Sequence, residues 1–590
     1  MSRTAPAPVL ELSDLTVAYP AAPAPAVDGA ALTARPGRTV ALVGESGSGK
    51  SSLAAAAAGL SVPGARVRAA VHTVGGVDMR GAGQRAWRAV HGSVLGFVPQ
   101  DAGTGLNPVR SVAGQLAHTL RTRGARRREA AERAAEALAG VGLEPRLHGR
   151  RRPHELSGGQ RQRILLALAL AGEPRLVIAD EPTSALDVTV QRQVLDLLAE
   201  RTARAGAALV LITHDLGVAA DRADDVLVMS GGRIVEAGTA AQVLESPREP
   251  YTRRLLAAAP GLDAPRLIAA PRGGPAQPQE PPVLRAAGLV RDFAHGGGSV
   301  RAVDGVSLEL PRGRTLGIVG ESGSGKSTTA RLLVGLEPAD AGEIELLGAP
   351  VTGRRAEAVR LARRVRFVHQ DPSASLDPRR SAGDSIAEPL AGFGIGTRAE
   401  RPARVRALLE RVALPADAAR RRPGELSGGQ RQRVAIARAL AVDPEVVVLD
   451  EPVSALDVSV QAQILELLAG LQRELGLSYV FISHDLAVVR QIAHDVLVMA
   501  QGRVVDAGPT EEVFAAPTAP TTRALLAAVP GRAQRPPSAG PATAAGAAPP
   551  GAPASGPPAA GRSHLVPSHP DRSPDPSQPP SRTAAQIGAR

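Results

Sequence analysis

Lysine occurs only twice among the 590 residues, although lysine and arginine together number 69. Both lysines, Lys50 and Lys326, lie in the same motif, Gly-Glu-Ser-Gly-Ser-Gly-Lys-Ser. A compact ammonium fits between two phosphate groups where the planar fork of an arginine does not. We therefore predict that Lys50 and Lys326 contact the β- and γ-phosphates of a nucleotide in two separate phosphate-binding loops.

Each motif follows a short apolar run and precedes a helical pattern, which is the context that a phosphate-binding loop requires. Glycines allow the backbone angles that point successive N–H groups at phosphate oxygens, and the start of the helix adds its positive end. The serine after each lysine, Ser51 or Ser327, is predicted to hold Mg²⁺. The predicted ATP-binding residues of the two loops are Gly44, Glu45, Ser46, Gly47, Ser48, Gly49, Lys50, Ser51 and Ser52, and Gly320, Glu321, Ser322, Gly323, Ser324, Gly325, Lys326, Ser327 and Thr328.

Two acidic pairs follow the loops, each at the end of an apolar run that reads as a buried strand. The pairs are Asp180-Glu181 and Asp450-Glu451. Delivering two carboxylates from a buried strand costs desolvation, and a metal shell with a reacting water would offset that cost. We predict that Asp180 and Asp450 bind the Mg²⁺ shell. A cap on the next helix is the simpler alternative for an isolated pair, but the preceding loops favour the metal.

A histidine ends the next strand in both halves, as His214 in Ile-Thr-His-Asp and His484 in Ile-Ser-His-Asp. A lone histidine at a strand end is usually structural. Its repetition in register favours a role in the reaction, so His214 and His484 join Glu181 and Glu451, which are expected to orient the attacking water, as predicted catalytic residues.

The chain is an internal repeat, which appears when it is laid on itself with a shift of 270 residues. Gln100 then falls on Gln370 and Ser157 on Ser427. The segment from Lys50 to Gln100 is about six residues longer than the corresponding segment of the second copy. We predict a first domain over residues 8–262, a Pro-rich flexible linker over 263–281, a second domain over 282–532, and a Pro/Ala-rich disordered tail over 533–590.

Short apolar runs alternate with helical patterns in each copy, which predicts an α/β fold with a mainly parallel sheet and crossover helices. Their unbroken apolar character indicates strands buried on both faces. These runs are Thr39 to Val43, Leu176 to Ala179 and Leu209 to Thr213, and Leu316 to Val319, Val446 to Leu449 and Tyr479 to Ser483.

Composition excludes several classes of protein. The absence of cysteine rules out disulfides, thiolate zinc sites and iron–sulfur clusters. The net charge of +12 is not interleaved with stacking aromatics, so a nucleic-acid partner is not expected. We see no signal peptide at the start and no apolar run of the length, about 18 residues, that a spanning helix needs. We expect a cytoplasmic protein that touches a membrane only through partners.

Leu156-Ser157-Gly158-Gly159-Gln160 and Leu426-Ser427-Gly428-Gly429-Gln430 resemble the signature motif of the ABC ATPase family. Gln100, Gln370 and the Ser-Ala-Leu-Asp segments that end at Asp187 and Asp457 extend the resemblance over nearly all of both copies. It implies two tandem P-loop NTPase domains. Each would have a RecA-like mainly parallel core, an antiparallel β subdomain and a helical signature subdomain.

A serine followed by two glycines at a helix start is a second anion site without its own lysine, so it needs a partner. In the family two domains pair head to tail. The resemblance therefore implies that Ser427, Gly428, Gly429 and Gln430 close on ATP held by Lys50, while Ser157, Gly158, Gly159 and Gln160 close on ATP held by Lys326. This pairing would form an internal pseudo-dimer.

The same resemblance implies further roles. Tyr19 and Phe293 would stack on adenine, and the two histidines would contact the γ-phosphate. Gln100 and Gln370 would sense Mg²⁺ and contact membrane subunits. Neither site lacks a motif residue, so both are predicted to hydrolyse ATP.

A narrower resemblance follows each catalytic core. Ser246 to Leu256 is similar to the C-terminal segment of ABC ATPases that serve peptide, nickel and glutathione importers, and Leu106-Asn107-Pro108 and Leu376-Asp377-Pro378 point the same way. The second copy departs from the pattern, with Thr521 in the place of Tyr251. The resemblance implies two transmembrane permease subunits, an extracellular substrate-binding protein, and a position at the cytoplasmic face of the cell membrane.

Two alternatives stay open: a tandem sugar-importer ATPase, and a soluble ABC protein that acts on ribosomes or nucleic acid. The Pro-rich linker and the lack of cysteine argue against the second, and two complete sites with the Tyr251 segment argue against the first. Peptides are the favoured cargo ahead of nickel and glutathione. The direction of transport rests on resemblance alone, and the composition of the tail indicates no role.

Overall fold

The computed structural model describes residues 6–20, 22–101, 103, 105–183, 186–268, 281–295, 298–351, 354–454 and 456–531, which belong to one compact unit. The predicted disordered tail, 533–590, and residues 269–280 of the predicted linker lie outside these ranges.

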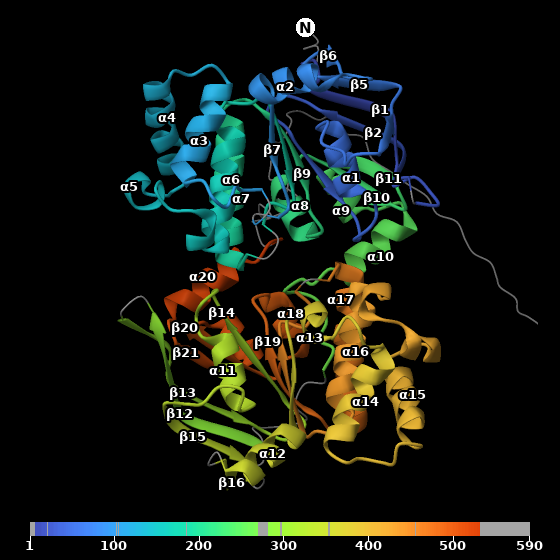
Figure 1. Ribbon diagram of the computed structural model, residues 1–590, viewed down its shortest axis with the longest axis vertical. Helices are drawn as coiled ribbons and strands as arrows, with labels where there is room; N and C mark the ends of the chain where they lie inside the picture. Colours follow the sequence, from blue (N-terminus) through green and yellow to red (C-terminus); the bar gives the residue numbers. More distant parts are fainter. Residues whose placement is uncertain are drawn as a thin grey trace, which may run out of the picture. The chain divides into compact units, whose positions relative to one another are not determined.

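A six-stranded sheet forms the centre of the first copy, in the order β11-β10-β3-β9-β8-β7 (Figure 1). All neighbours are parallel except β10 and β11. Every residue of β8 and β9 is buried, as the unbroken apolar runs predict. The strands are β3 (Thr39–Val43), β7 (Leu95–Val98), β8 (Leu176–Asp180), β9 (Ala208–Ile212), β10 (Asp225–Ser230) and β11 (Arg233–Thr239).

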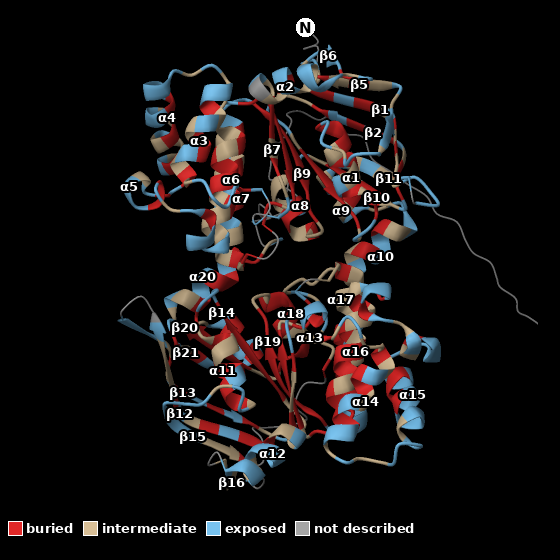
Figure 2. Cartoon of the chain, viewed as in Figure 1, coloured by how far each residue is buried: buried red, intermediate tan, exposed pale blue. Residues whose placement is uncertain are grey.

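The second copy repeats this sheet with the order β17-β18-β19-β14-β20-β21, and again only the last pair is antiparallel. The central parallel strands of both sheets are buried (Figure 2), whereas the antiparallel edge strands β11 and β21 are mostly not. The strands of the second sheet are β14 (Thr315–Gly320), β17 (Val365–Val368), β18 (Val446–Asp450), β19 (Ser478–Ile482), β20 (Asp495–Ala500) and β21 (Arg503–Pro509).

Each copy also has an antiparallel sheet that contributes to the core around its P-loop helix. In the first copy the strands are β1 (Leu10–Ala18), β2 (Val27–Ala34), β4 (Arg66–Arg68), β5 (Val71–Val74) and β6 (Val77–Asp78). In the second they are β12 (Leu284–His295), β13 (Gly298–Leu310), β15 (Ala341–Leu346) and β16 (Ala349–Pro350). Most of the extra residues of the first copy fall in the segment where two short strands, β4 and β5, pair with β1 in place of the single β15.

Helices form the third part of each copy. In the first copy α3, α4 and α6 pack together on the side of the parallel sheet away from β1, β2 and β5 (Figure 1). The helices of the first copy are α1 (Lys50–Ala57), α2 (Gln84–Ser93), α3 (Val112–Thr122), α4 (Arg127–Gly140), α5 (Pro145–His148), the 3₁₀ turn η1 (Pro153–Glu155), α6 (Gly158–Leu170), α7 (Val188–Arg204), α8 (Leu216–Arg222), α9 (Ala240–Glu245) and α10 (Pro250–Ala258).

The second copy has the corresponding set, in which α14, α15 and α16 pack together. Its helices are α11 (Lys326–Leu333), α12 (Arg355–Arg364), α13 (Pro372–Ser375), α14 (Ala382–Gly392), α15 (Arg401–Arg411), η2 (Ala416–Arg420), η3 (Pro423–Glu425), α16 (Gly428–Leu440), α17 (Val458–Leu475), α18 (Leu486–Ile492), α19 (Thr510–Ala515) and α20 (Pro520–Ala528). The predicted division into a parallel core, an antiparallel subdomain and a helical subdomain is confirmed.

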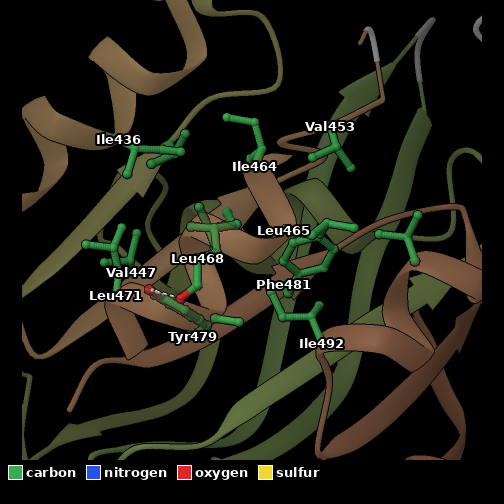
Figure 3. Close-up of a cluster of buried hydrophobic side chains, with 14 of the residues drawn as sticks. Ile436, Val447, Val453, Ile464, Leu465, Leu468, Leu471, Tyr479, Phe481 and Ile492 are labelled. Atoms are coloured by element: carbon green, nitrogen blue, oxygen red, sulfur yellow. Dashed lines mark hydrogen bonds between the residues drawn. The ribbon is translucent and has the colours of Figure 1, made fainter. Parts of the chain in front are cut away.

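The core of the second copy shows how these layers hold together (Figure 3). Phe481 and Tyr479 of β19 are fully buried, and Ile464, Leu468 and Leu471 of α17 recur at helical spacing in the same cluster. The Tyr479 hydroxyl donates to the Leu468 carbonyl oxygen at 3.1 Å, so the one polar atom of this ring is satisfied. Burying each such side chain stabilises the fold by about 1.5–3 kcal/mol.

Residues 266–268, in the first part of the predicted linker, pack on the second copy. The Leu267 N–H donates to the Gln491 carbonyl oxygen at 2.9 Å, and Ile268 is buried in the core cluster of the second copy. Arg266 adds a hydrogen bond to the carbonyl oxygen of Ala493. The Pro-rich composition of the whole stretch concealed these two apolar anchors. In the part of the chain that the structure describes, no helix has the length and apolarity to cross a membrane.

Candidate functional site

The first P-loop connects the end of β3 to the start of α1. Gly44 has a φ of +151°, and a Cβ there would lie 2.2 Å from the carbonyl oxygen of Met229, so only glycine fits. Lys50 is buried, and its Nζ donates to the carbonyl oxygens of Gly44 and Glu45 at 2.8 Å each. Burial lowers the pKa of Lys50, although Glu181 and Asp180 act against that shift.

The second P-loop has the same geometry between β14 and α11. Lys326 donates to the carbonyl oxygens of Gly320 and Glu321 at 2.8 and 2.7 Å, and burial lowers its pKa too. Ser48 and Ser324 each have a buried hydroxyl without a hydrogen-bond partner among the described residues. Each P-loop therefore binds its lysine through two backbone carbonyl oxygens and has one buried serine hydroxyl without a hydrogen-bond partner among the described residues.

A serine and an aspartate meet beside each loop. The Ser51 hydroxyl donates to Oδ1 of Asp180 at 3.2 Å, and the Ser327 hydroxyl donates to Oδ1 of Asp450 at 3.1 Å. Both aspartates are buried at the ends of β8 and β18, and burial raises the pKa of each. Paired hydroxyl and carboxylate oxygens are hard donors of the kind that Mg²⁺ prefers.

Glu181 stands immediately after Asp180 with a φ of +44°, which is unusual for a residue with a side chain. The Gln100 side-chain amide donates to its Oε2 at 2.9 Å, and Nδ1 of His214 lies 3.3 Å from its Oε1. Burial opposes ionisation of Glu181, but the hydrogen bond and charge of His214 outweigh it and hold the pKa below its usual range. The bond to Glu181 in turn raises the pKa of His214.

Glu451 repeats this arrangement with a φ of +47°. Gln370 donates to its Oε2 at 2.8 Å, and Nδ1 of His484 lies 3.3 Å from the same oxygen. Burial alone would lower the pKa of His484, but Glu451 reverses the shift and raises it. The structure thus brings the predicted carboxylate, histidine and glutamine of each copy into one cluster next to the P-loop.

The signature residues cap their own helices. The Ser157 hydroxyl accepts from the Gln160 N–H at 3.3 Å, and the Gln160 side chain accepts from the Ser157 N–H at 3.1 Å, which is a capping box at the start of α6. Ser427 and Gln430 do the same for α16. A Cβ on Gly159 would lie 2.8 Å from Val190, so close packing against α7 requires this glycine.

A cavity of about 850 Å³ lies at the second P-loop, and its lining combines residues from both copies. The described residues that line it include Ser46, Gln100, Glu181, Asp187, His214, Phe293, Lys326, Ser327, Gln370, Glu451 and His484, but neither Ser157 nor Ser427. The structure therefore does not bring the signature serines to this cavity.

The two predicted adenine-stacking residues lie near their loops in different ways. The Tyr19 hydroxyl donates to Ser52, in the first turn of α1, at 3.0 Å. Phe293 lines the cavity at the second P-loop, and the Arg291 guanidinium lies 4.9 Å from the centre of its ring. One face of the Phe293 ring is thus partly covered by the Arg291 guanidinium.

Three contacts were not predicted from the sequence. Oδ2 of Asp187 accepts from the Ser322 N–H in the other copy at 3.4 Å, and the Thr189 hydroxyl donates to Glu321 at 3.1 Å. The Tyr251 hydroxyl accepts from the N–H of Glu45 at 3.1 Å. Asp187 also caps α7, so its sequence signal is that of an ordinary helix cap, and no local pattern links Tyr251 to a loop 206 residues earlier.

Comparison with known proteins places these residues in context. The family described as "ABC transporter" matches residues 27–184 and 303–454, and the one described as "Oligopeptide/dipeptide transporter, C-terminal region" matches residues 235–283. The chain is 43% identical to the oligopeptide transport ATP-binding protein OppD of Mycobacterium tuberculosis, over 89% of this chain and 98% of that protein.

Two further relatives have other described cargoes. The peptidoglycan transport ATP-binding protein YejF of Agrobacterium fabrum is 44% identical, over 90% of this chain and 97% of that protein. The glutathione import ATP-binding protein GsiA of Escherichia coli O157:H7 is 45% identical, over 84% of this chain and 85% of that protein.

Proposed function

Because the chain belongs to the ABC transporter family and is an ATPase, we propose that it is the ATP-hydrolysing subunit of an importer for di- and oligopeptides. The observation that carries this proposal is the match of residues 235–283 to the oligopeptide/dipeptide transporter C-terminal region, which follows the first of two complete sites. Relatives described for oligopeptides, peptidoglycan and glutathione share most of the length of the chain, so a peptide-like cargo is their common chemistry.

In this proposal the two P-loops hold the phosphates of ATP. Lys50 and Lys326 leave the backbone carbonyls that they now contact and bind the β- and γ-phosphates. The unsatisfied hydroxyls of Ser48 and Ser324 support an anionic ligand, because a buried hydroxyl without a partner is costly. Tyr19 and Phe293 are the proposed contacts for adenine.

Mg²⁺ is the proposed cofactor, and the oxygen donors beside each loop fit it. Ser51 with Asp180, and Ser327 with Asp450, would hold the ion, with Gln100 and Gln370 near its shell. When bound, Mg²⁺ would neutralise phosphate charge during phosphoryl transfer.

Glu181 and Glu451 are proposed to orient the attacking water. Their lowered pKa keeps each carboxylate ionised near neutral pH, so its oxygens can accept hydrogen bonds from a water molecule. His214 and His484 hold these carboxylates from one side and are proposed to contact the γ-phosphate.

The two copies are proposed to pair head to tail as an internal pseudo-dimer. Asp187 reaches the second P-loop, and its charge acts on Lys326, while the charge of Asp457 acts on Lys50. These interactions between the copies support a closed state in which the signature motif of each copy completes the ATP site of the other. The site of Lys50 would be completed by Ser427, Gly428, Gly429 and Gln430, and the site of Lys326 by Ser157, Gly158, Gly159 and Gln160.

The proposed partners are two transmembrane permease subunits and an extracellular substrate-binding protein. The chain would lie at the cytoplasmic face of the cell membrane, held there by the permease subunits. Gln100 and Gln370 join the catalytic clusters to the loops that follow β7 and β17, so these loops are the proposed contacts with the permease.

Purification of the tagged chain from its native membranes tests the proposal. We expect permease subunits to accompany it, and we expect di- to pentapeptides with the binding protein to stimulate ATP hydrolysis. Stimulation by a sugar with its binding protein, or recovery of ribosomes or nucleic acid without a permease, would overturn the peptide-import function.

A further inference from the structure

The C-terminal helix of the first copy touches the P-loop of the same copy. Tyr251 lies in the first turn of α10, and its hydroxyl accepts from the Glu45 N–H at 3.1 Å. The side chain is partly buried and packs against a cluster that includes Val43, Leu216 and Leu255. Burial raises the pKa of Tyr251, so the hydroxyl stays protonated at neutral pH.

The start of α10 is itself held in place by β11. The Glu236 carboxylate accepts from the N–H groups of Arg248 and Glu249 at 2.7 and 3.3 Å. These bonds satisfy donors at the helix N-terminus. They also fix the position of Tyr251, because α10 begins directly after Glu249 and Tyr251 is its second residue.

The peptide that Tyr251 contacts is the one that holds the P-loop lysine. Lys50 donates to the Gly44 carbonyl oxygen at 2.8 Å, and Tyr251 accepts from the Glu45 N–H of the same peptide group. Ser230, at the end of β10, lies beside the Tyr251 hydroxyl. When Lys50 moves to a phosphate, the bond from the Glu45 N–H to Tyr251 can continue to hold the start of the loop in place.

The second copy has the same scaffold without this hydroxyl. Pro520 begins α20 as Pro250 begins α10, and Asp506 accepts from the Ala519 N–H at 2.9 Å as Glu236 does from its helix. The next residue is Thr521, whose side chain is too short for the contact, and Ala500 replaces Ser230. The two P-loops are therefore supported differently.

We propose that Tyr251 is a positioning residue that preorganises the first P-loop, so that it strengthens ATP binding at the site of Lys50 and not at the site of Lys326. This inference rests on the proposed function of the two loops. One neutral hydrogen bond corresponds to a factor of about three to ten in an equilibrium constant, and a loop already ordered loses less freedom when its ligand binds.

Variants in which one of the two P-loops is inactivated allow ATP binding to be measured at each site separately. Lys326→Ala leaves the first site and Lys50→Ala leaves the second, and ATP affinity is measured in each by titration with Mg-ATP. We expect Tyr251→Phe to weaken ATP binding about three- to tenfold in the Lys326→Ala chain and to leave it unchanged in the Lys50→Ala chain. In the first chain KM for ATP should rise by the same factor while kcat changes little.

Thr521→Val is the matched control, because it removes a hydroxyl at the corresponding position of α20. It should leave ATP affinity unchanged in both backgrounds, and the thermal unfolding temperature should be the same for the Phe and Val variants. Equal weakening of both sites by Tyr251→Phe, or no weakening of the first, would overturn the proposal. Loss of ATP binding in the Lys326→Ala chain before Tyr251 is changed would instead overturn the function of the first loop.

Discussion

The chain uses lysine only in its two P-loops and arginine at every other basic position, and the structure gives the physical reason. Lys50 and Lys326 are 5% and 6% exposed, and each Nζ fits between two backbone carbonyl oxygens of its own loop. A guanidinium is larger and planar, so it cannot occupy the same position without moving the loop.

We therefore expect Lys50→Arg to abolish ATP binding at the first site although the charge is kept. The number of ATP molecules bound per chain, measured by calorimetry, should fall from two to one, and Lys326→Arg should remove the other. Arg128→Lys, at a residue whose side chain is 93% exposed, is the control and should leave two. Two ATP molecules bound by the Lys50→Arg chain would contradict the assignment.

The carboxylates Glu181 and Glu451 should matter for hydrolysis and not for binding, because each is held by a histidine and a glutamine as the proposed acceptor for the attacking water. We expect the double variant Glu181→Gln, Glu451→Gln to bind ATP normally and to hydrolyse it about 100-fold more slowly or worse, as loss of a water-orienting base predicts. Phosphate release under saturating ATP measures this. The exposed Glu132→Gln serves as the control, and wild-type turnover in the double variant would refute the role.

At the scale of elements, corresponding strands of the two copies are anchored by different chemistry. The N–H at the start of β3 donates from Thr39 to Oδ2 of Asp224 at 2.8 Å. In β14 the N–H of Thr315 donates to Nδ1 of His494 at 3.0 Å. An imidazole accepts this bond only while that nitrogen is unprotonated.

His494 should make the second copy sensitive to acid. Burial, with help from Arg314 and Arg266, lowers the pKa of His494 to about 4 from 6.5. Between these values the unfolded chain binds a proton that the folded chain does not, so the free energy of unfolding falls as pH falls from about 6.5 to about 4, by up to about 3 kcal/mol. Above pH 6.5 this group contributes no pH dependence.

Urea unfolding at pH 7 and pH 5 measures this effect. His494→Asp copies the residue of the first copy, and the variant should lose less stability over that interval than the unchanged chain. An equal loss in both proteins would show that His494 is not the group responsible.

At the scale of the whole molecule, Asp187 of the first copy contacts the P-loop of the second copy. Asp187 uses one oxygen to cap α7 by accepting from the Val190 N–H at 2.9 Å, and the other to accept from the Ser322 N–H. A single residue therefore has both a local and a long-range role.

Asp187→Ser separates these two roles, because one hydroxyl oxygen can keep the helix cap but cannot also reach the second P-loop. We expect it to weaken ATP binding several-fold at the site of Lys326, measured in the Lys50→Ala chain. Binding at the site of Lys50, measured in the Lys326→Ala chain, should be unchanged. The same weakening at both sites would indicate general damage to the fold and not a contact between the copies.

Much of the fold and of each site was predictable because it depends on local spacing. Apolar runs such as Val446 to Leu449 indicated buried parallel strands, and β18 is buried at every residue. Residues that end neighbouring parallel strands share one edge of the sheet, so Asp180, Glu181 and His214 could be placed together beside Lys50 before the structure was known.

Tertiary structure alone decided the contacts between residues that are distant in the chain and lack a distinctive local pattern. In the sequence, Tyr251 belongs to the segment similar to the C-terminal part of peptide-importer ATPases, Asp187 ends a Ser-Ala-Leu-Asp segment, and Leu267 with Ile268 lies in a Pro-rich linker. Their partners lie on other elements: the first P-loop, the second P-loop and the segment around α18. Motif spacing determines which residues can do chemistry, while packing between elements determines which of them support each site.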